Sequence, residues 1–293
     1  MSDPAARTEL PGLVDHHVHL GLVEWERLAG GPLCEVHDLG WEPDAVQAIA
    51  AAPPAGVRIR FAGPFHTAVG GYPSGRAWAP AGAVVQLRDV REASEAVARA
   101  AAAGVFAVKV ALSALMPLLA DEPLEALIRA AHAHGLPVIA HTEGPGQAWR
   151  AIIAGVDVLA HTPWDERLTE AQAGRAASSG MTWISTLAIH EGEALATAVD
   201  NLGRFHAAGG RVRYGTDMGN GTQPVGVNPR EVELLGEAGL AGEALLDAVC
   251  GDGPGAPLLA SHHPFPRDSK QLIGWLADCE RIDHPAAVGG DAP

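Results

Sequence analysis

The chain has 293 residues, 47% hydrophobic and 19% charged, which is the composition of a globular protein with ample apolar material for a core. Its 35 acidic and 20 basic residues give a formal net charge of −15, which argues against nucleic acid and anionic membranes as partners. No apolar run reaches the roughly 18 residues of a membrane span, and residues 1–11 do not form the apolar core of a signal peptide. Three scattered cysteines indicate neither a disulfide framework nor a thiolate metal site. We therefore expect a cytoplasmic protein that acts on a small molecule, and leave a homo-oligomer open.

Predicted strands and helices alternate along most of the chain. The expected strands are 13–20, 33–40, 57–62, 105–112, 137–142, 156–162, 182–189 and 212–217. The expected helices between them are 44–52, 90–103, 121–134, 147–154, 169–179 and 191–208, several of which are followed by glycine. This alternation predicts a parallel α/β fold, and eight strands are the number that closes a (β/α)₈ TIM barrel. The alternative is an open doubly wound sheet, but no G-x-G-x-x-G sequence follows the first strand.

The remainder of the chain adds helices to the barrel and no second domain. Helices are expected near 231–236, 241–250 and 270–278. No linker or low-complexity tract separates them from the barrel, so we predict a single domain over residues 1–280. Residues 281–293 have the composition of a disordered tail.

His17 and His19 lie two residues apart in the first predicted strand. Simple alternation puts them on one face together with Asp15. Two imidazoles on a rigid strand can hold one metal ion, because neutral imidazole is a common ligand of zinc-like metals. On this segment alone, a pair of hydrogen-bonded core histidines is an equally good interpretation.

Further polar residues lie in or at the end of other apolar strands. They are Lys109, His141, His161 and Asp217. A buried polar group without a partner is costly, and the carboxyl ends of barrel strands meet at one face. The pattern therefore predicts that these residues and the two histidines form one metal site.

These motifs resemble the amidohydrolase superfamily of metal-dependent hydrolases, and most closely its imidazolonepropionase and prolidase-like branch. The matching pieces are His17-Val18-His19, Ala140-His141, Ala160-His161-Thr162-Pro163, Gly215-Thr216-Asp217 and the strand that contains Lys109. Two features depart from the branch. Its Gly-Gly-His is Gly70-Gly71-Tyr72 here, and the chain ends lack an obvious strand series for a β-sandwich. We therefore expect a barrel largely without the accessory sandwich.

The resemblance implies a binuclear metal centre. His17, His19 and Asp217 would hold one metal, and His141 and His161 the other. Lys109 would bridge the two as a carbamate formed with CO₂, since burial lowers the pKa of a lysine and yields a reactive neutral amine. In the alternative, Lys109 stays an amine and pairs with Asp217 beside a single metal. Zn²⁺ suits these N and O ligands best, while Mn²⁺, Fe²⁺ and Co²⁺ are also compatible.

The predicted function is hydrolysis of a C–N bond in an amide, cyclic amide or peptide-like small molecule, with Asp217 as the catalytic proton carrier. Ester or lactone hydrolysis, deamination and a lyase or cyclase step on the same metals are alternatives, because fold does not determine chemistry. A catalytically silent binding barrel is the alternative outside enzymology. Candidate substrate-binding residues at strand ends and in loops are His66, Tyr72, Arg76, Trp164, His190 and Asn220.

Overall fold

The computed structural model describes residues 7–251 and 257–282, and its centre is a set of parallel strands. One sheet has the order β2-β3-β4, with β2 (Leu13–Val18), β3 (Leu33–Asp38) and β4 (Arg58–Phe61). The second sheet has the order β11-β10-β9-β8-β7-β5-β6. Its strands are β5 (Phe65–Ala68), β6 (Val84–Leu87), β7 (Val108–Ser113), β8 (Val138–Glu143), β9 (Val158–Leu159), β10 (Thr182–Ile184) and β11 (Arg211–Arg213).

Backbone hydrogen bonds join the two sheets on both sides and close a barrel. On one side, the amide of Phe106, just before β7, donates to the carbonyl of Phe61 in β4 at 3.1 Å. On the other side, the amide of His16 in β2 donates to the carbonyl of Tyr214, directly after β11, at 3.0 Å. Strands β2, β3, β4 and β7 to β11 thus follow one another around the ring, and the predicted (β/α)₈ barrel is confirmed.

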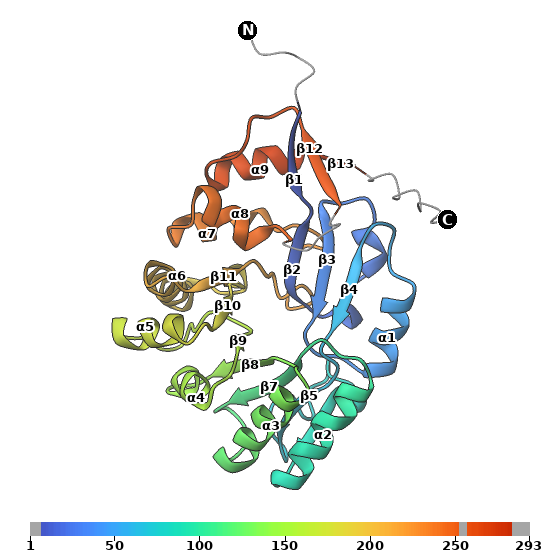
Figure 1. Ribbon diagram of the computed structural model, residues 1–293, viewed down its shortest axis with the longest axis vertical. Coiled ribbons are helices and arrows are strands. Elements are labelled where there is room, and N and C mark those ends of the chain that lie inside the picture. Colours follow the sequence, from blue (N-terminus) through green and yellow to red (C-terminus); the bar gives the residue numbers. More distant parts are fainter. Residues whose placement is uncertain (1–6, 252–256, 283–293) are drawn as a thin grey trace, which may run out of the picture.

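Helices cover the outside of the strands (Figure 1). They are α1 (Pro43–Ala51), α2 (Val90–Ala102), α3 (Asp121–Ala133), α4 (Gln147–Ala154), α5 (Glu170–Ser178), α6 (Gly192–Ala207), α7 (Pro229–Glu237), α8 (Gly242–Val249) and α9 (Ser269–Ala277). Each buries one apolar face; in α2 this face consists of Ala93, Ala96, Val97 and Ala100. In the described part of the chain, no helix is long and apolar enough to cross a membrane.

The seventh barrel strand is shorter than the predicted 182–189. β10 ends at Ile184, and Leu187–Ile189 form a 3₁₀ turn after Thr186, whose φ is +42°. The buried carboxylate of Glu231 on α7 accepts the amide protons of Leu187 at 2.9 Å and of Ala188 at 2.7 Å. These bonds take backbone groups that a longer strand would have used, so the chain turns away from the sheet.

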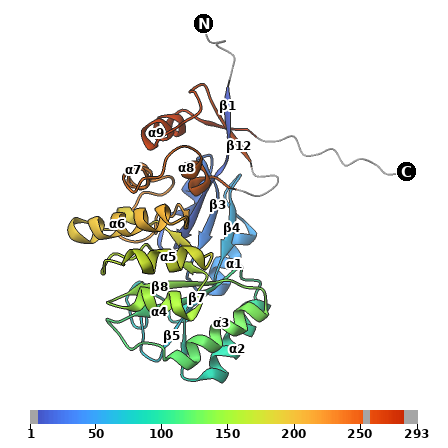
Figure 2. The ribbon, with the colours of Figure 1, turned by 60° about the vertical axis from the view of Figure 1, so that its left-hand side comes forward.

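A second, small sheet joins the two ends of the described chain. The barrel is largely without an accessory β-sandwich, as expected, but it carries this three-stranded sheet. Its antiparallel strands are β1 (Thr8–Pro11), β12 (Leu258–Ser261) and β13 (Glu280–Ile282), in the order β1-β12-β13. Figure 1 shows these strands side by side at one end of the molecule, and Figure 2 shows β1 and β12 there from a second direction. Strands this short have too few residues to show alternation, which is why the sequence pattern did not indicate them.

This sheet also corrects the start of the predicted tail. Arg281 and Ile282 belong to β13, where Arg281 donates to the carbonyl of Leu33 at 2.7 Å. The rest of the predicted tail, 283–293, lies outside the described residues. That residues 1–280 form a single domain stays a prediction.

Candidate metal centre

A cavity of about 490 Å³ lies at the carboxyl ends of the barrel strands, and all six predicted metal-binding residues line it. His17 lies near the end of β2 and His19 directly follows that strand, Lys109 and His141 lie within β7 and β8, and His161 and Asp217 lie in the segments after β9 and β11. The six are His17, His19, Lys109, His141, His161 and Asp217. Each is less than one-tenth exposed, so their polar atoms face one another and the cavity instead of bulk water.

A β-bulge in β2 positions the first histidines. The three-residue step from Asp15 to Val18 is matched by a two-residue step on β3, so β2 contains one extra residue. The bulge breaks the simple alternation that placed Asp15 on the same face as His17. Asp15 is absent from the described residues that line the cavity, and its carboxylate instead accepts the hydroxyl proton of Thr216 at 2.6 Å.

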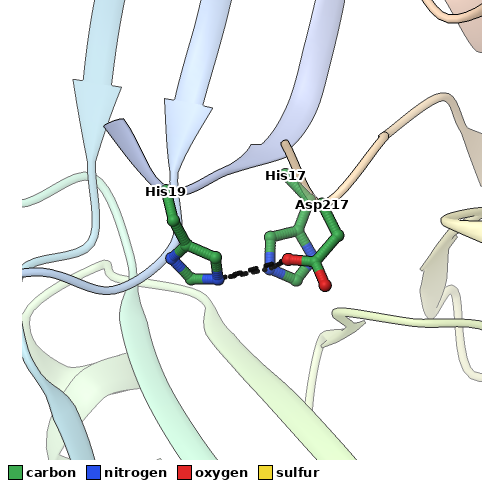
Figure 3. Close-up of side chains that lie close together, drawn as sticks. All are labelled: His17, His19 and Asp217. Carbon is green, nitrogen blue, oxygen red and sulfur yellow. Dashed lines mark hydrogen bonds and ion pairs between the residues drawn. The ribbon is translucent and has the colours of Figure 1, made fainter. Parts of the chain in front are cut away.

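Three ligand atoms lie at equal distances from one another in this cavity. The Nε2 atoms of His17 and His19 are 3.3 Å apart, and each is 3.3 Å from Oδ1 of Asp217. Figure 3 shows the two rings and the carboxylate pointing toward a common centre. Among the described residues, these three form a group whose spacing suits one metal ion.

The protons of these rings are held on the side away from the common centre. Nδ1 of His17 donates to the carbonyl of Ala160 at 2.8 Å, and Nδ1 of His19 donates to that of Gly40 at 3.0 Å. Because a carbonyl only accepts, the lone pair of the neutral imidazole form lies on Nε2 in both rings. Burial lowers the pKa of His17 well below its ordinary value, which keeps that ring neutral. Oδ1 of Asp217 has no hydrogen-bond partner in the described chain.

Three lone-pair atoms 3.3 Å apart repel one another unless a cation lies between them. A tetrahedral ion with ligand bonds of about 2.0–2.1 Å separates its ligands by about 3.3 Å, so the observed spacing fits a divalent ion of this size. The chemistry of the donors agrees with this, since neutral imidazole and carboxylate are both good ligands. The group formed by His17, His19 and Asp217 could therefore bind a divalent metal ion.

His161 and His141 extend the same cluster. The His161 ring lies 4.6 Å from that of His17 and 5.0 Å from that of His141, measured between centroids. Nδ1 of His161 is 2.9 Å from the hydroxyl oxygen of Thr186. Nε2 of His141 is buried without a hydrogen-bond partner among the described residues, and it lies 3.6 Å from Oε2 of Glu143. These rings offer a second set of nitrogen ligands beside the first.

The charges of Lys109 and Asp217 are set by burial and by the neighbouring histidines. Burial lowers the pKa of Lys109 to about 7, against the opposing effect of the carboxylates of Asp217 and Asp38. A neutral amine is thus well populated at neutral pH. For Asp217, burial alone would raise the pKa, but His17 and its neighbouring histidines outweigh it and hold the pKa well below its usual range. Asp217 is therefore a carboxylate.

Five of the six predicted substrate-binding residues line the cavity: Tyr72, Arg76, Trp164, His190 and Asn220. Asn220 donates to Oδ2 of Asp217 at 2.8 Å, so its amide orients that carboxylate. The prediction for His66 is not supported. His66 is absent from the described lining residues, and its Nδ1 donates to the carbonyl of Lys109 at 2.9 Å. It lies within β5, which continues to Ala68, so His66 pairs with the neighbouring strand instead of ending one.

Glu143 and Trp78 are among the lining residues that were not predicted. Glu143 lies two positions after His141 on β8, and its Oε2 accepts the hydroxyl proton of Ser113 at 2.7 Å. The period-two spacing in His141-Thr142-Glu143 was a usable signal for this residue. Trp78 reaches the cavity from the loop after β5, 6.2 Å from Tyr72 between ring centroids. No pattern in the sequence distinguishes it from other loop residues.

No protein-family model and no curated protein sequence matches this chain. Solved structures with the same fold are found. A Xaa-Pro dipeptidase with methionine bound in its active site has a TM-score of 0.75 at 20% identity, over 94% of this chain and 86% of its own. Ochratoxinase from A. niger has a TM-score of 0.69 at 17% identity, over 87% of this chain and 77% of its own.

Phenylurea hydrolase B is similar to the same extent. Its TM-score is 0.69 at 18% identity, over 94% of this chain and 85% of its own. At these identities the similarity establishes the fold. The chain therefore has the barrel fold of these hydrolases, over nearly its whole length.

Proposed function

We propose that the protein is a metal-dependent hydrolase of the amidohydrolase superfamily that cleaves a C–N bond in a small molecule. The observation that carries this proposal is the triangle of lone-pair atoms from His17, His19 and Asp217, 3.3 Å on each side, which calls for a cation. The names of two of the similar structures, a Xaa-Pro dipeptidase and a phenylurea hydrolase, support the choice of reaction.

We further propose that the cavity holds two metal ions, with zinc the best match to its nitrogen and oxygen ligands. His17, His19 and Asp217 would hold one ion, and His141 and His161 the other. Nε2 of His141 is buried and makes no hydrogen bond within the described chain, which supports the second position. Lys109 fits the bridging role because its neutral amine, once carboxylated by CO₂, provides two anionic oxygens.

The protein's own groups would position the substrate and move the proton. A bound divalent metal lowers the pKa of a coordinated water and polarises the substrate carbonyl. Asp217 is ionised, faces the common centre through Oδ1, and is held through Oδ2 by Asn220. It is placed to accept a proton from the attacking water and to deliver it to the leaving nitrogen, which would otherwise depart as an unstable anion.

Metal analysis of the purified protein by mass spectrometry tests the metal site. We expect one to two equivalents of a transition metal after metal-replete expression, and a clear loss in His17→Ala. The matched control is His134→Ala, because His134 is exposed at the end of α3 and should not change the metal content. A metal-free wild-type protein after such expression would contradict the proposal.

A substrate screen then tests the reaction. Amides, cyclic amides and dipeptides should be hydrolysed, and a chelator should abolish turnover. Exclusive turnover of lactones, esters or aminated heterocycles would assign the same site to a different reaction. Metal-dependent binding without any turnover would identify a silent binding barrel.

A further inference from the structure

Asp38 is a buried carboxylate near the triangle of His17, His19 and Asp217, and the proposed chemistry does not use it. It is the last residue of β3 and is 0% exposed. It is absent from the described residues that line the cavity, so its role is not direct contact with a substrate. A buried carboxylate is costly unless its oxygens accept hydrogen bonds, so the groups that donate to it indicate what it holds in place.

Two backbone amides donate to the carboxylate of Asp38. Oδ2 accepts the amide proton of Leu20 at 2.8 Å, and Oδ1 accepts that of Gly40 at 3.1 Å. Leu20 directly follows His19 and begins a 3₁₀ turn, Leu20–Leu22, whose first amides have no acceptor within the turn. Asp38 supplies an acceptor there, so it ties the end of β2 to the end of β3.

Gly40 connects Asp38 with the ring of His19. Its carbonyl accepts the proton of Nδ1 of His19 at 3.0 Å. Gly40 has a φ of +152°, and a Cβ there would lie 2.2 Å from the ring of Phe65, so this close approach requires glycine. Because a carbonyl can only accept, the position of Gly40 keeps the proton of the neutral His19 ring on Nδ1. The lone pair is then on Nε2, the atom that belongs to the triangle.

We propose that Asp38 is a positioning residue of the metal site, which holds the carbonyl of Gly40 against Nδ1 of His19 so that Nε2 can bind the metal. This inference rests on the proposed metal site and adds to it a residue that touches neither metal nor substrate. His17 is held independently, because its Nδ1 donates to the carbonyl of Ala160 at 2.8 Å. Loss of such support behind a ligand typically lowers metal affinity about 10- to 100-fold.

Zinc affinity in Asp38→Asn gives the first test. The substitution keeps the size of the side chain but leaves one acceptor oxygen for two amide protons. In competition with a chromogenic chelator, we expect at least one zinc equivalent to bind about 10- to 100-fold more weakly than in the wild type. The matched control is Asp157→Asn. Asp157 is partly exposed, accepts the amide proton of Val138 at 2.7 Å and is absent from the described lining residues, so its loss should leave zinc affinity unchanged.

The histidine tautomers of the metal-free protein give a readout that a general loss of stability would not reproduce. Long-range proton–nitrogen correlation spectra of histidine-labelled protein, recorded at a pH at which both rings are neutral, distinguish a proton on Nδ1 from one on Nε2. His17→Gln and His19→Gln assign the two signals. In the wild type both rings should carry the proton on Nδ1. In Asp38→Asn, His19 should become a mixture of tautomers, while His17 should stay unchanged because Ala160 still accepts its proton.

Each other outcome separates the inference from the proposed function. Unchanged zinc affinity in Asp38→Asn would overturn the inference. Weaker zinc binding with an unchanged His19 tautomer would mean that Asp38 acts through its charge, which also acts on Lys109, and would overturn it as well. If the wild type binds no metal, the proposed metal site fails instead, and the tautomer of His19 in Asp38→Asn still decides the inference. Should Asp38→Asn not fold, Asp38→Ser, which keeps one acceptor and buries no amide group, replaces it in both measurements.

Discussion

At the scale of single residues, Lys109 is the side chain whose chemistry depends most on its surroundings. It is 1% exposed on a strand that is buried along its whole length, and burial brings its pKa to about 7. A surface lysine would remain an ammonium ion and could not react with CO₂. The same burial makes the position sensitive to substitution and to pH, which gives two predictions.

The first prediction concerns the bridging role of Lys109. Lys109→Ala should lose at least one metal equivalent, because two adjacent cations need an anion between them. Formate, acetate or propionate should partly restore both metal content and activity by filling the vacated space, whereas chloride at the same ionic strength should not. Full metal content and most of the rate in Lys109→Ala would instead favour a single metal held by His17, His19, Asp217 and one further histidine.

The second prediction concerns pH and the metal-free protein. The folded pKa of Lys109, about 7, is below the ordinary 10.5, so the unfolded chain binds the extra proton between these values. Stability must therefore rise with pH across that window as the penalty for the charged form is relieved. Chemical unfolding of chelator-treated protein in CO₂-free buffer should show a steeper rise from pH 7 to 9.5 in the wild type than in Lys109→Met. Equal slopes would show that Lys109 is not the group that makes the free energy of unfolding rise with pH.

At the scale of elements, β2 and the segment after β11 form the junction on which the metal site depends. Asp15 accepts the hydroxyl proton of Thr216 at 2.6 Å, the amide of Thr216 at 3.1 Å and the amide of His17 at 3.1 Å. One buried carboxylate thus fixes both the bulge that presents His17 and the strand end that presents Asp217. The junction therefore keeps His17 and Asp217 at the distance from each other that a shared metal ion requires.

The third prediction is that Asp15→Ala lowers both stability and metal content. It leaves three donors without their acceptor, which should reduce the free energy of unfolding by about 2–4 kcal/mol. Urea unfolding and metal analysis check this. The matched control is Asp89→Ala, which removes the N-cap of α2 at the surface and should cost about 1 kcal/mol without loss of metal. Full metal occupancy in a stable Asp15→Ala would contradict the role of the junction.

The sequence predicted the elements that follow simple periodic rules. Buried barrel strands such as β7 and β8 are apolar on both faces, and Lys109 and His141 stand out in them because polar groups are costly there. The bulge at Asp15 could not be predicted, since one extra residue leaves the apolar pattern of β2 unchanged. His66 was misplaced because the sequence does not show where β5 ends.

At the scale of the whole molecule, the cavity and the small sheet lie at opposite ends of the barrel strands. The sheet contacts the chain ahead of β3 and β4: Arg281 donates to the carbonyls of Gly31, of Leu33 at 2.7 Å and of Ala55 at 3.2 Å. The triangle of His17, His19 and Asp217 lies at or just after the carboxyl ends of β2 and β11. Stability and chemistry are thereby separated, as is common in barrels of this type.

The fourth prediction follows from this separation. Arg281→Ala should lower the free energy of unfolding by about 1–3 kcal/mol, because three backbone carbonyls lose a charged donor, but metal content and kcat should stay at wild-type values. The control is Arg7→Ala. Its ion pair with Glu280 is between exposed side chains and should contribute less than about 1 kcal/mol. A loss of metal in Arg281→Ala would show that the two ends are coupled.

The pairing of β2 with the segment after β11, which closes the barrel, also sets an order of events during synthesis. His16 and Tyr214 form the hydrogen bonds of this pairing but lie 198 positions apart in the sequence. At about 5–20 residues per second, a ribosome needs roughly 10–40 s to make the segment between them. Until then β2 has an unpaired edge, which is a template for aggregation. Asp217, the carboxylate of the metal triangle, leaves the ribosome only after this interval, so a nascent chain holding His17 and His19 alone binds metal weakly until the ring has closed.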